Sequence, residues 1–178
     1  MLDDLKDKTS EMLNKTKLTN PQELFVHNLG ACLTMENTVN DMLAKLIQEA
    51  NDSELKQQLR HHKEETEAQI RNLRQAFQSL GQEPEERPCP AIEGIEKEGE
   101  ANLKMADDAL TDAVILGGCA ETEHHEIAVY ENLIVHADAM GHEDIVALLR
   151  ENLEQEQHTL GEVLKATLKT AQSSGAAA

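Results

Sequence analysis

Apolar side chains recur every three or four residues along most of the chain, which is the spacing of positions on one face of an α-helix. In the first long segment they run from Phe25 to Leu46 in alternating steps of four and three, a heptad pattern. The periodicity predicts an all-α protein. Its four long helices are expected at about 21–50, 53–80, 109–138 and 143–171, with a short acidic helix at about 93–107.

Local signals predict where these helices begin and end. Asn20 followed by Pro21 is typical of an N-cap and a first helical residue, and Asp52 lies in a tight turn that supplies a second N-cap. Gly81 closes the second helix. Three of the four prolines fall within 81–92, so this stretch is predicted to be non-helical.

These boundaries divide the chain into three parts. Residues 1–19 are predicted as a lead-in helix with few apolar positions, 20–172 as a helical bundle, and 173–178 as a disordered tail.

The lengths of the connections predict the topology. Helices one and two, and helices three and four, are joined by a few residues, so each pair is expected to be an antiparallel hairpin. Almost thirty residues separate the second helix from the third. A crossover of that length can run back along a helix of ~45 Å. We therefore predict a ferritin-like four-helix bundle with one long crossover and short accessory helices.

The composition and the net charge of the chain limit the kinds of partner that it is expected to bind. The formal net charge of −18 argues against nucleic acid and against anionic membranes as partners, and no apolar run is long enough to span a bilayer. Three widely spaced cysteines form no disulfide framework, which favours a reducing cytoplasmic location. The simplest interpretation of the negative charge is a solvated surface, although an acidic surface also attracts cations.

Acidic residues interrupt the apolar faces of three helices. Glu36, Glu123 and Glu156 stand where Leu or Val is expected, and no Lys or Arg shares their faces. Glu36 and Glu65 lie about 15 and 13 residues from the first turn, and Glu123 and Glu156 about 17 and 16 from the second. Each hairpin therefore brings its two carboxylates to one level, within ~3–6 Å along the axis. Burying such acids costs several kcal/mol unless a cation compensates.

A pair of metal ions accounts for this pattern best. Two divalent cations balance four carboxylates, and oxygen-rich ligands suit iron, with manganese or a mixed Fe/Mn pair as the alternatives. The competing interpretation treats each acid as a buried hydrogen-bonded group, or, for Glu65, as a solvated charge beside the apolar face.

Four separated stretches also resemble the YciF/YciE-like family, a branch of the ferritin-like superfamily. They are LFVHNL with MEN (24–37), HHKEETEAQIRNL (61–73), ETEHHEIAVYENL (121–133) and LRENLEQEQHTL (149–160). The resemblance covers about 20–170. It implies a helical bundle that is usually dimeric and is linked to bacterial stress responses.

The resemblance to the wider superfamily implies a ligand set. Glu36, Glu65 and Glu156 would be ligands from the first, second and fourth helices, and Glu123 with Glu126 would form a paired site on the third. The superfamily commonly has a His three residues after the second-helix Glu, but Ala68 stands there, and Thr159 stands three residues after Glu156. His62 and Gln69, on the same stripe as Glu65, are candidate replacements.

Three functions remain open at this point. The first is a metal-dependent oxidoreductase of the di-iron oxidase or peroxidase type, which needs a separate electron donor because the chain has no CxxC module. The second is a non-catalytic, homo-oligomeric stress or interaction protein with a degenerate metal site. An iron-storage cage is disfavoured because no fifth helix follows the bundle. Gly117 and Gly118, inside the third helix, indicate a close helix contact, with a dimer interface as one place for it.

Overall fold

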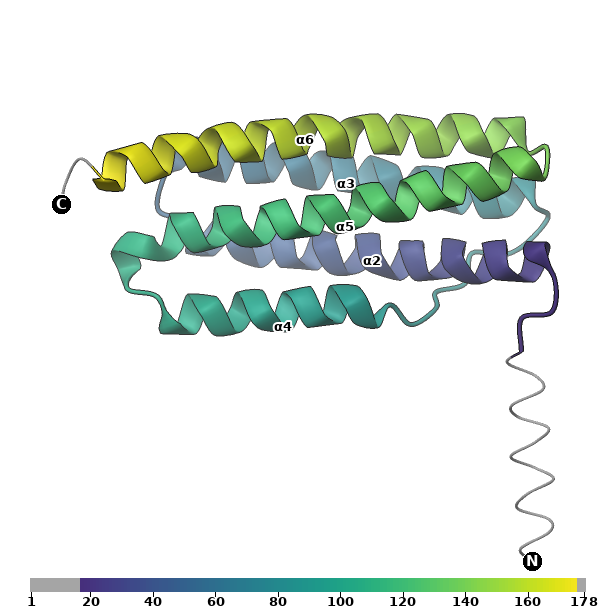
Figure 1. Cartoon of the computed structure of the whole chain (residues 1–178), viewed down its shortest axis with the longest axis horizontal. Helices are drawn as coiled ribbons and strands as arrows, with labels where there is room; N and C mark the ends of the chain where they lie inside the picture. Colours follow the sequence, from purple (N-terminus) through teal and green to yellow (C-terminus); the bar gives the residue numbers. More distant parts are fainter. Residues whose placement is uncertain (1–16, 176–178) are drawn as a thin grey trace, which may run out of the picture.

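The computed structural model describes residues 17–175, with side chains as far as 173, and this part of the chain is helical without a strand. A long bundle is built from four helices and flanked by a shorter one (Figure 1). The bundle helices are α2 (Pro21–Glu49), α3 (Ser53–Ser79), α5 (Thr111–Ala139) and α6 (Glu143–Gly175). The crossover carries α4 (Pro90–Met105) and a 3-10 turn, η1 (Asp108–Leu110).

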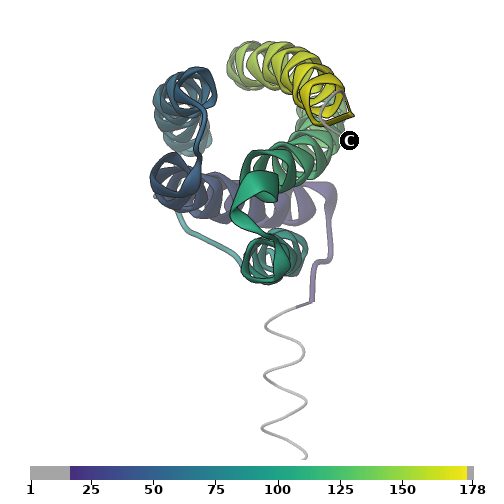
Figure 2. The same ribbon diagram turned by 90° about the vertical axis from the view of Figure 1, so that its left-hand side faces the viewer.

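The four long helices occupy the corners of the bundle. Each packs against two neighbours, in the cyclic order α2, α3, α6 and α5. Helices α2 and α3 form one antiparallel hairpin and α5 and α6 the other, while α3 and α5 run parallel (Figure 1). The end-on view shows α4 outside the bundle, where it packs against α5 and α2 (Figure 2). The predicted all-α bundle with one long crossover is confirmed.

Three of the predicted signals for helix starts and stops are also confirmed. The side chain of Asn20 accepts a hydrogen bond from the backbone N–H of Glu23 at 2.9 Å, and Pro21 opens α2. Asp52 Oδ1 accepts from the N–H of Leu55 at 2.9 Å, which caps α3. Gly81 follows α3 with a φ of 68°, a left-handed conformation that favours glycine.

Three predicted boundaries were wrong. Helix α4 begins at Pro90, inside the stretch predicted to be non-helical, because a proline in the first helical turn gives up no hydrogen bond. Helix α6 continues to Gly175, four residues beyond its predicted end. Residues 17–19 are not helical, and the rest of the predicted lead-in helix lies outside the described residues, as does the end of the tail.

The crossover lies directly against α2 at Gly30. The backbone N–H of Arg87 donates to the carbonyl oxygen of Gly30 at 3.1 Å. A Cβ atom at Gly30 would lie 2.5 Å from the backbone oxygen of Glu85. Glycine is therefore required there, and the close approach fixes the connection that leads into α4.

Within the chain, no other helix lies close to Gly117 or Gly118, and a close contact with a second copy of the chain stays a prediction. A Cβ atom added at either position would meet nothing within 4 Å apart from the helix's own nearby backbone. Gly117 is exposed, and Gly118 faces open space beside the bundle.

The apolar core is most complete at the end where α2 begins and α3 ends. Fully buried side chains from all four long helices meet there: Phe25, Leu29, Leu73, Phe77, Leu133, Ile145 and Leu149. Over residues 17–175, no helix combines the length and the apolar character that crossing a membrane requires.

Candidate metal centre

Four glutamates lie in the middle of the bundle with no exposed surface: Glu36 on α2, Glu123 and Glu126 on α5, and Glu156 on α6. None of the lysines and arginines within the described residues is buried. These acids therefore have no buried side-chain cation to balance them, which is an expensive arrangement for ionised carboxylates.

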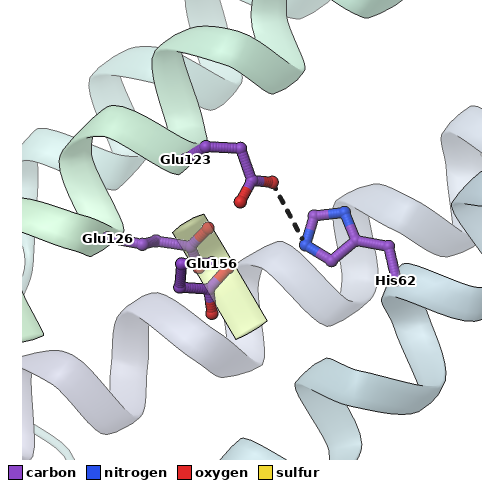
Figure 3. A group of neighbouring side chains, drawn as sticks. All are labelled: His62, Glu123, Glu126 and Glu156. Atoms are coloured by element: carbon purple, nitrogen blue, oxygen red, sulfur yellow. Dashed lines mark ion pairs between the residues drawn. The ribbon is translucent and has the colours of Figure 1, made fainter. Parts of the chain in front are cut away.

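Three of these acids converge with a histidine. His62, Glu123, Glu126 and Glu156 each offer one ligand atom, and these atoms all lie within 4.8 Å of one another. Figure 3 shows Glu123 and Glu126 approaching from α5 and His62 from α3, with the Glu156 carboxylate beside Glu126. The Nε2 atom of His62 lies 3.2 Å from Oε1 of Glu123. The cluster thus joins three helices from both hairpins.

Most polar atoms of this cluster lack a partner. Apart from the 3.2 Å contact between His62 Nε2 and Glu123 Oε1, the carboxylate oxygens of Glu123, Glu126 and Glu156 are buried without a hydrogen bond. Nearly all buried polar groups in proteins are hydrogen-bonded, so such a concentration needs an explanation. Convergent carboxylate oxygens and an imidazole nitrogen are the donor set that a transition-metal ion accepts, and the residues therefore fit a metal.

Burial controls the protonation of these groups. It raises the pKa of Glu123 to about 11, with the charge of Glu156 as the next cause, and it raises the pKa of Glu126 well above the usual range. Burial also raises the pKa of Glu156 to about 7. It lowers the pKa of His62 to about 4, so the imidazole is neutral and its nitrogen lone pair is available to a metal ion.

Glu36 lies next to the cluster and is held by its own network. Tyr130 donates a short hydrogen bond to Oε1 of Glu36, and Asn152 Nδ2 donates to the Tyr130 hydroxyl at 3.0 Å. Oδ1 of Asn152 in turn accepts from Asn72 at 2.8 Å. The second oxygen of Glu36 has no partner. The network orients the carboxylate, as outer partners of metal ligands do.

The network was only partly anticipated from the sequence. Tyr130 falls on the apolar face of the third predicted helix, but the sequence does not show that its hydroxyl contacts Glu36. Asn152, which is fully buried, was missed altogether. Its position one helical turn before Glu156 was the available signal.

Glu65 and Gln69 stand at the margin of the cluster. The Glu65 side chain remains 17% exposed, with Oε1 3.5 Å from Nε2 of His61, and it accepts a 3.4 Å hydrogen bond from Thr159. Gln69 is buried, and neither end of its amide has a hydrogen-bond partner. Of the seven sequence-predicted ligands, the structure brings four within 4.8 Å and places Glu36, Glu65 and Gln69 around them.

A groove leads from the surface to this margin. It has a volume of about 640 Å³ and runs between α3 and α6. Its charged lining consists of Glu54, Glu64, Glu65 and Glu162 with one cation, Arg60, and the histidines His61, His62 and His158 also line it. The cluster is therefore reached from solvent along a surface rich in carboxylates.

Known proteins resemble this chain in both sequence and fold. Escherichia coli (strain K12) protein YciF is 30% identical over 140 residues, which cover 78% of this chain and 84% of YciF. The crystal structure of the E. coli stress protein YciF matches the fold of this chain with a TM-score of 0.83 at 26% sequence identity. The match covers 87% of this chain and 99% of the chain in that structure.

Two further solved structures match. YcfI from Rhodopseudomonas palustris, provisionally described as a structural protein, is 36% identical with a TM-score of 0.81, over 83% of this chain and 95% of YcfI. A protein from Xanthomonas campestris pv. campestris shares the fold with a TM-score of 0.68 at 22% identity, over 86% of this chain and 95% of that one.

The family comparison covers almost all of the described chain. Residues 20–175 match the model of a domain of unknown function, DUF892. With the likeness to YciF in sequence and in fold, this confirms the predicted resemblance. The chain therefore belongs to the DUF892 family, in its YciF-like branch of the ferritin-like bundles.

Proposed function

We propose that this protein binds two divalent metal ions inside the bundle: two iron ions, with manganese or a mixed Fe/Mn pair as the alternatives. The observation that carries the proposal is the set of buried carboxylate oxygens without hydrogen-bond partners, in a core without a buried lysine or arginine. The ligands would be Glu36, Glu123, Glu126, Glu156 and His62, with Glu65 and Gln69 at the margin.

Charge balance favours two ions over one. Four fully buried glutamates bring four negative charges once they are ionised, which two divalent cations neutralise and one cation does not. Neutral His62 adds a nitrogen donor without adding charge. An oxygen-rich set with one nitrogen suits iron or manganese, whereas structural zinc sites usually hold more nitrogen or sulfur.

The proposed activity is a redox reaction with peroxide or O2. A pair of ferrous ions would supply the two electrons that, with two protons, reduce one hydrogen peroxide molecule to two water molecules. The chain would hold the ligands and exclude bulk water. Tyr130 and Asn152 would fix the orientation of the Glu36 carboxylate.

The carboxylate-rich groove between α3 and α6 supports a route for the ions. Its acidic side chains attract divalent cations, and Glu65 lies between the groove and the buried cluster. In this role Glu65 would transfer ions as well as bind them.

Metal analysis tests the proposal. Protein loaded with Fe(II) or Mn(II) under anaerobic conditions and then desalted should retain about two ions per chain. Glu156→Gln should retain fewer ions. Glu131→Gln, which changes an exposed glutamate of α5, should match the unaltered protein. Failure of the unaltered protein to retain either metal would refute the proposal.

A second experiment separates metal binding from redox activity. Iron-loaded protein should consume hydrogen peroxide with oxidation of two ferrous ions per peroxide, and the Glu131→Gln control should do the same. Metal retention without peroxide or O2 consumption would leave the metal site standing but reject the redox activity.

One observation favours the alternative of a non-catalytic interaction protein with a degenerate site. Ala68 and Thr159 replace the histidines common in the superfamily, and Thr159 instead donates a hydrogen bond to Glu65. The same metal analysis decides between the two functions.

We also propose a cytoplasmic homodimer that receives electrons from a separate donor. The three cysteines are free, which is consistent with a reducing compartment. Leu164 and Leu168, which are 50% and 60% exposed on α6, offer an apolar contact for a second copy. Light scattering measures the oligomeric state, and a monomer at micromolar concentration would reject the dimer.

A further inference from the structure

A second, apolar cavity shares His62 and Cys119 with the lining of the acidic groove. It has a volume of about 380 Å³ and is bounded by α2, α4 and α5. Its walls are largely aliphatic and include Val39, Leu43, Leu46, Ile95, Leu103 and Ile115. A volume in this range is typical of pockets that hold small organic molecules.

The inner end of the cavity reaches the candidate metal centre. His62, whose Nε2 atom lies 3.2 Å from Glu123, forms part of its lining together with Cys119 and Thr122. A molecule in the cavity would therefore have one end beside the cluster. The cavity therefore lies beside the candidate metal centre, as a pocket that binds a reactant lies beside the groups that act on it.

Gly118 gives independent support for a cavity that is kept open. This residue lines the cavity in the middle of α5, where glycine is a poor helix former, and a Cβ atom there would meet nothing within 4 Å. No close packing or backbone conformation requires glycine at this position. The absent side chain instead leaves room in the cavity.

The charges around the cavity select a neutral ligand. At the outer rim Lys45 of α2 pairs with Glu96 at 2.9 Å and Glu100 at 3.3 Å, both on α4. The lining holds three glutamates and two lysines, and the lysine of the central pair is already engaged. The lining therefore carries an excess of negative charge, which repels an anionic group, and the apolar walls disfavour any buried charge.

From these observations we propose that the cavity between α2, α4 and α5 binds a small, neutral, apolar organic molecule with one end at His62. The molecule is larger than benzene, because an apolar cavity of roughly 150 Å³ already accommodates benzene. This deepens the proposed function by giving the metal centre an organic ligand. The binding itself is measurable on the metal-free protein.

The test uses the neutral fluorescent probe N-phenyl-1-naphthylamine. The chain has no tryptophan, so the probe signal is free of indole fluorescence. We expect saturable binding to the metal-free full-length protein. We also expect displacement by 1-octanol, and at least tenfold weaker displacement by octanoate at pH 8.

Substitutions at the two adjacent glycines locate the probe. Gly118→Leu should fill the cavity and weaken probe binding at least tenfold, while Gly118→Ala should weaken it less. Gly117→Leu is the matched control, because Gly117 is an exposed glycine of the same helix that does not line the cavity. It should bind the probe as the unaltered protein does. Circular dichroism melting confirms that each variant is folded.

The outcomes separate this inference from the proposed metal site. Probe binding that is lost in Gly118→Leu but kept in Gly117→Leu supports the cavity, whether or not the protein retains metal. Absence of saturable binding, or equal binding by both leucine variants, would overturn the inference even if two metal ions per chain are found. Equal displacement by octanol and octanoate would overturn the selection for neutral ligands.

Discussion

The end of the bundle where α2 begins and the centre of the bundle are buried equally well but are built from different chemistry. At that end, Phe25, Leu73 and Phe77 meet Ile145 in an entirely apolar core. At the centre, glutamates occupy corresponding inward positions, and most of their oxygens have no hydrogen-bond partner. Burial of the first kind stabilises the fold, whereas burial of the second kind costs free energy until a cation arrives.

The comparison indicates how one small domain can contain both an apolar core and a group of buried acids. The apolar end supplies the stability that lets the centre keep groups that would otherwise oppose folding. Functional sites commonly break local rules of this kind while the rest of the fold compensates. In the metal-free protein, the apolar end should therefore raise the free energy of unfolding, whereas the buried carboxyl groups at the centre should lower it.

The largest effect is expected at the apolar end. Phe77→Ala removes a fully buried ring and should lower the free energy of unfolding by about 3–5 kcal/mol. The number of metal ions retained by the folded protein should not change, because Phe77 is not part of the cluster. Urea unfolding measures the first quantity and metal analysis the second. A cost below about 1 kcal/mol would mean that this end is not the source of stability.

A pH change should act on the centre. The pKa of Glu123 is raised from 4.5 to about 11, so between these values the folded, metal-free protein holds a proton that the unfolded chain does not. Stability therefore falls as pH rises. Lowering the pH from 8.5 to 7 should add about 2 kcal/mol for one such proton, at ~1.36 kcal/mol per pH unit.

Two checks accompany this pH measurement. His62 opposes the trend only below its unfolded pKa of 6.5, since its pKa is lowered in the folded protein, and the chosen range avoids that effect. In the metal-loaded protein the ions replace the protons, so the trend should weaken or reverse. A metal-free protein whose stability is constant from pH 7 to 8.5 would contradict the assignment of protonated carboxyl groups to the core.

Glu126→Gln should stabilise the metal-free protein by about 1–2 kcal/mol at pH 8, because the amide needs no proton to be buried. Its affinity for metal should fall at least tenfold, since one ligand oxygen is replaced by an amide. The exposed Glu131→Gln change should leave both quantities near their original values. Destabilisation of the metal-free Glu126→Gln protein would show that the carboxylate is compensated by something other than metal.

Tyr130→Phe should have the smallest effect. It removes the hydroxyl that donates to Glu36 and accepts from Asn152, at a cost of about 1 kcal/mol in stability. Metal affinity should decrease while the number of sites stays the same, because Glu36 loses its orienting partner. Titration with Mn(II) followed by electron paramagnetic resonance measures both. An unchanged affinity would show that Tyr130 does not position Glu36.

Much of the fold was predictable because helices follow local rules. The spacing of apolar residues predicted the four long helices, the caps at Asn20 and Asp52 were recognisable from residue type, and the long connection predicted parallel α3 and α5. The start of α4 was missed, because the prolines of that segment indicate a break and the first of the helical residues is itself a proline.

The surroundings of the cluster were less predictable because they depend on packing between distant segments. Glu126 lies to the side of the apolar face, yet it is fully buried, since α5 packs against α2, α4 and α6 together. The contact between Glu36 and Tyr130 joins residues 94 positions apart, and no local pattern predicts it. The cavity at Gly118 exists only where α4 lies beside α2 and α5.

The crossover has a consequence for how the molecule holds together. It is the single covalent link between a hairpin that contributes Glu36 and His62 and a hairpin that contributes Glu123, Glu126 and Glu156. Ions bound at the centre would act as a clasp between the two hairpins, as a cross-link between distant parts of a chain does. A break in the peptide chain near residue 85 would then leave two fragments that associate through their apolar faces and more tightly with metal bound. Bound metal would in that way add to the apolar contacts that hold the two hairpins together.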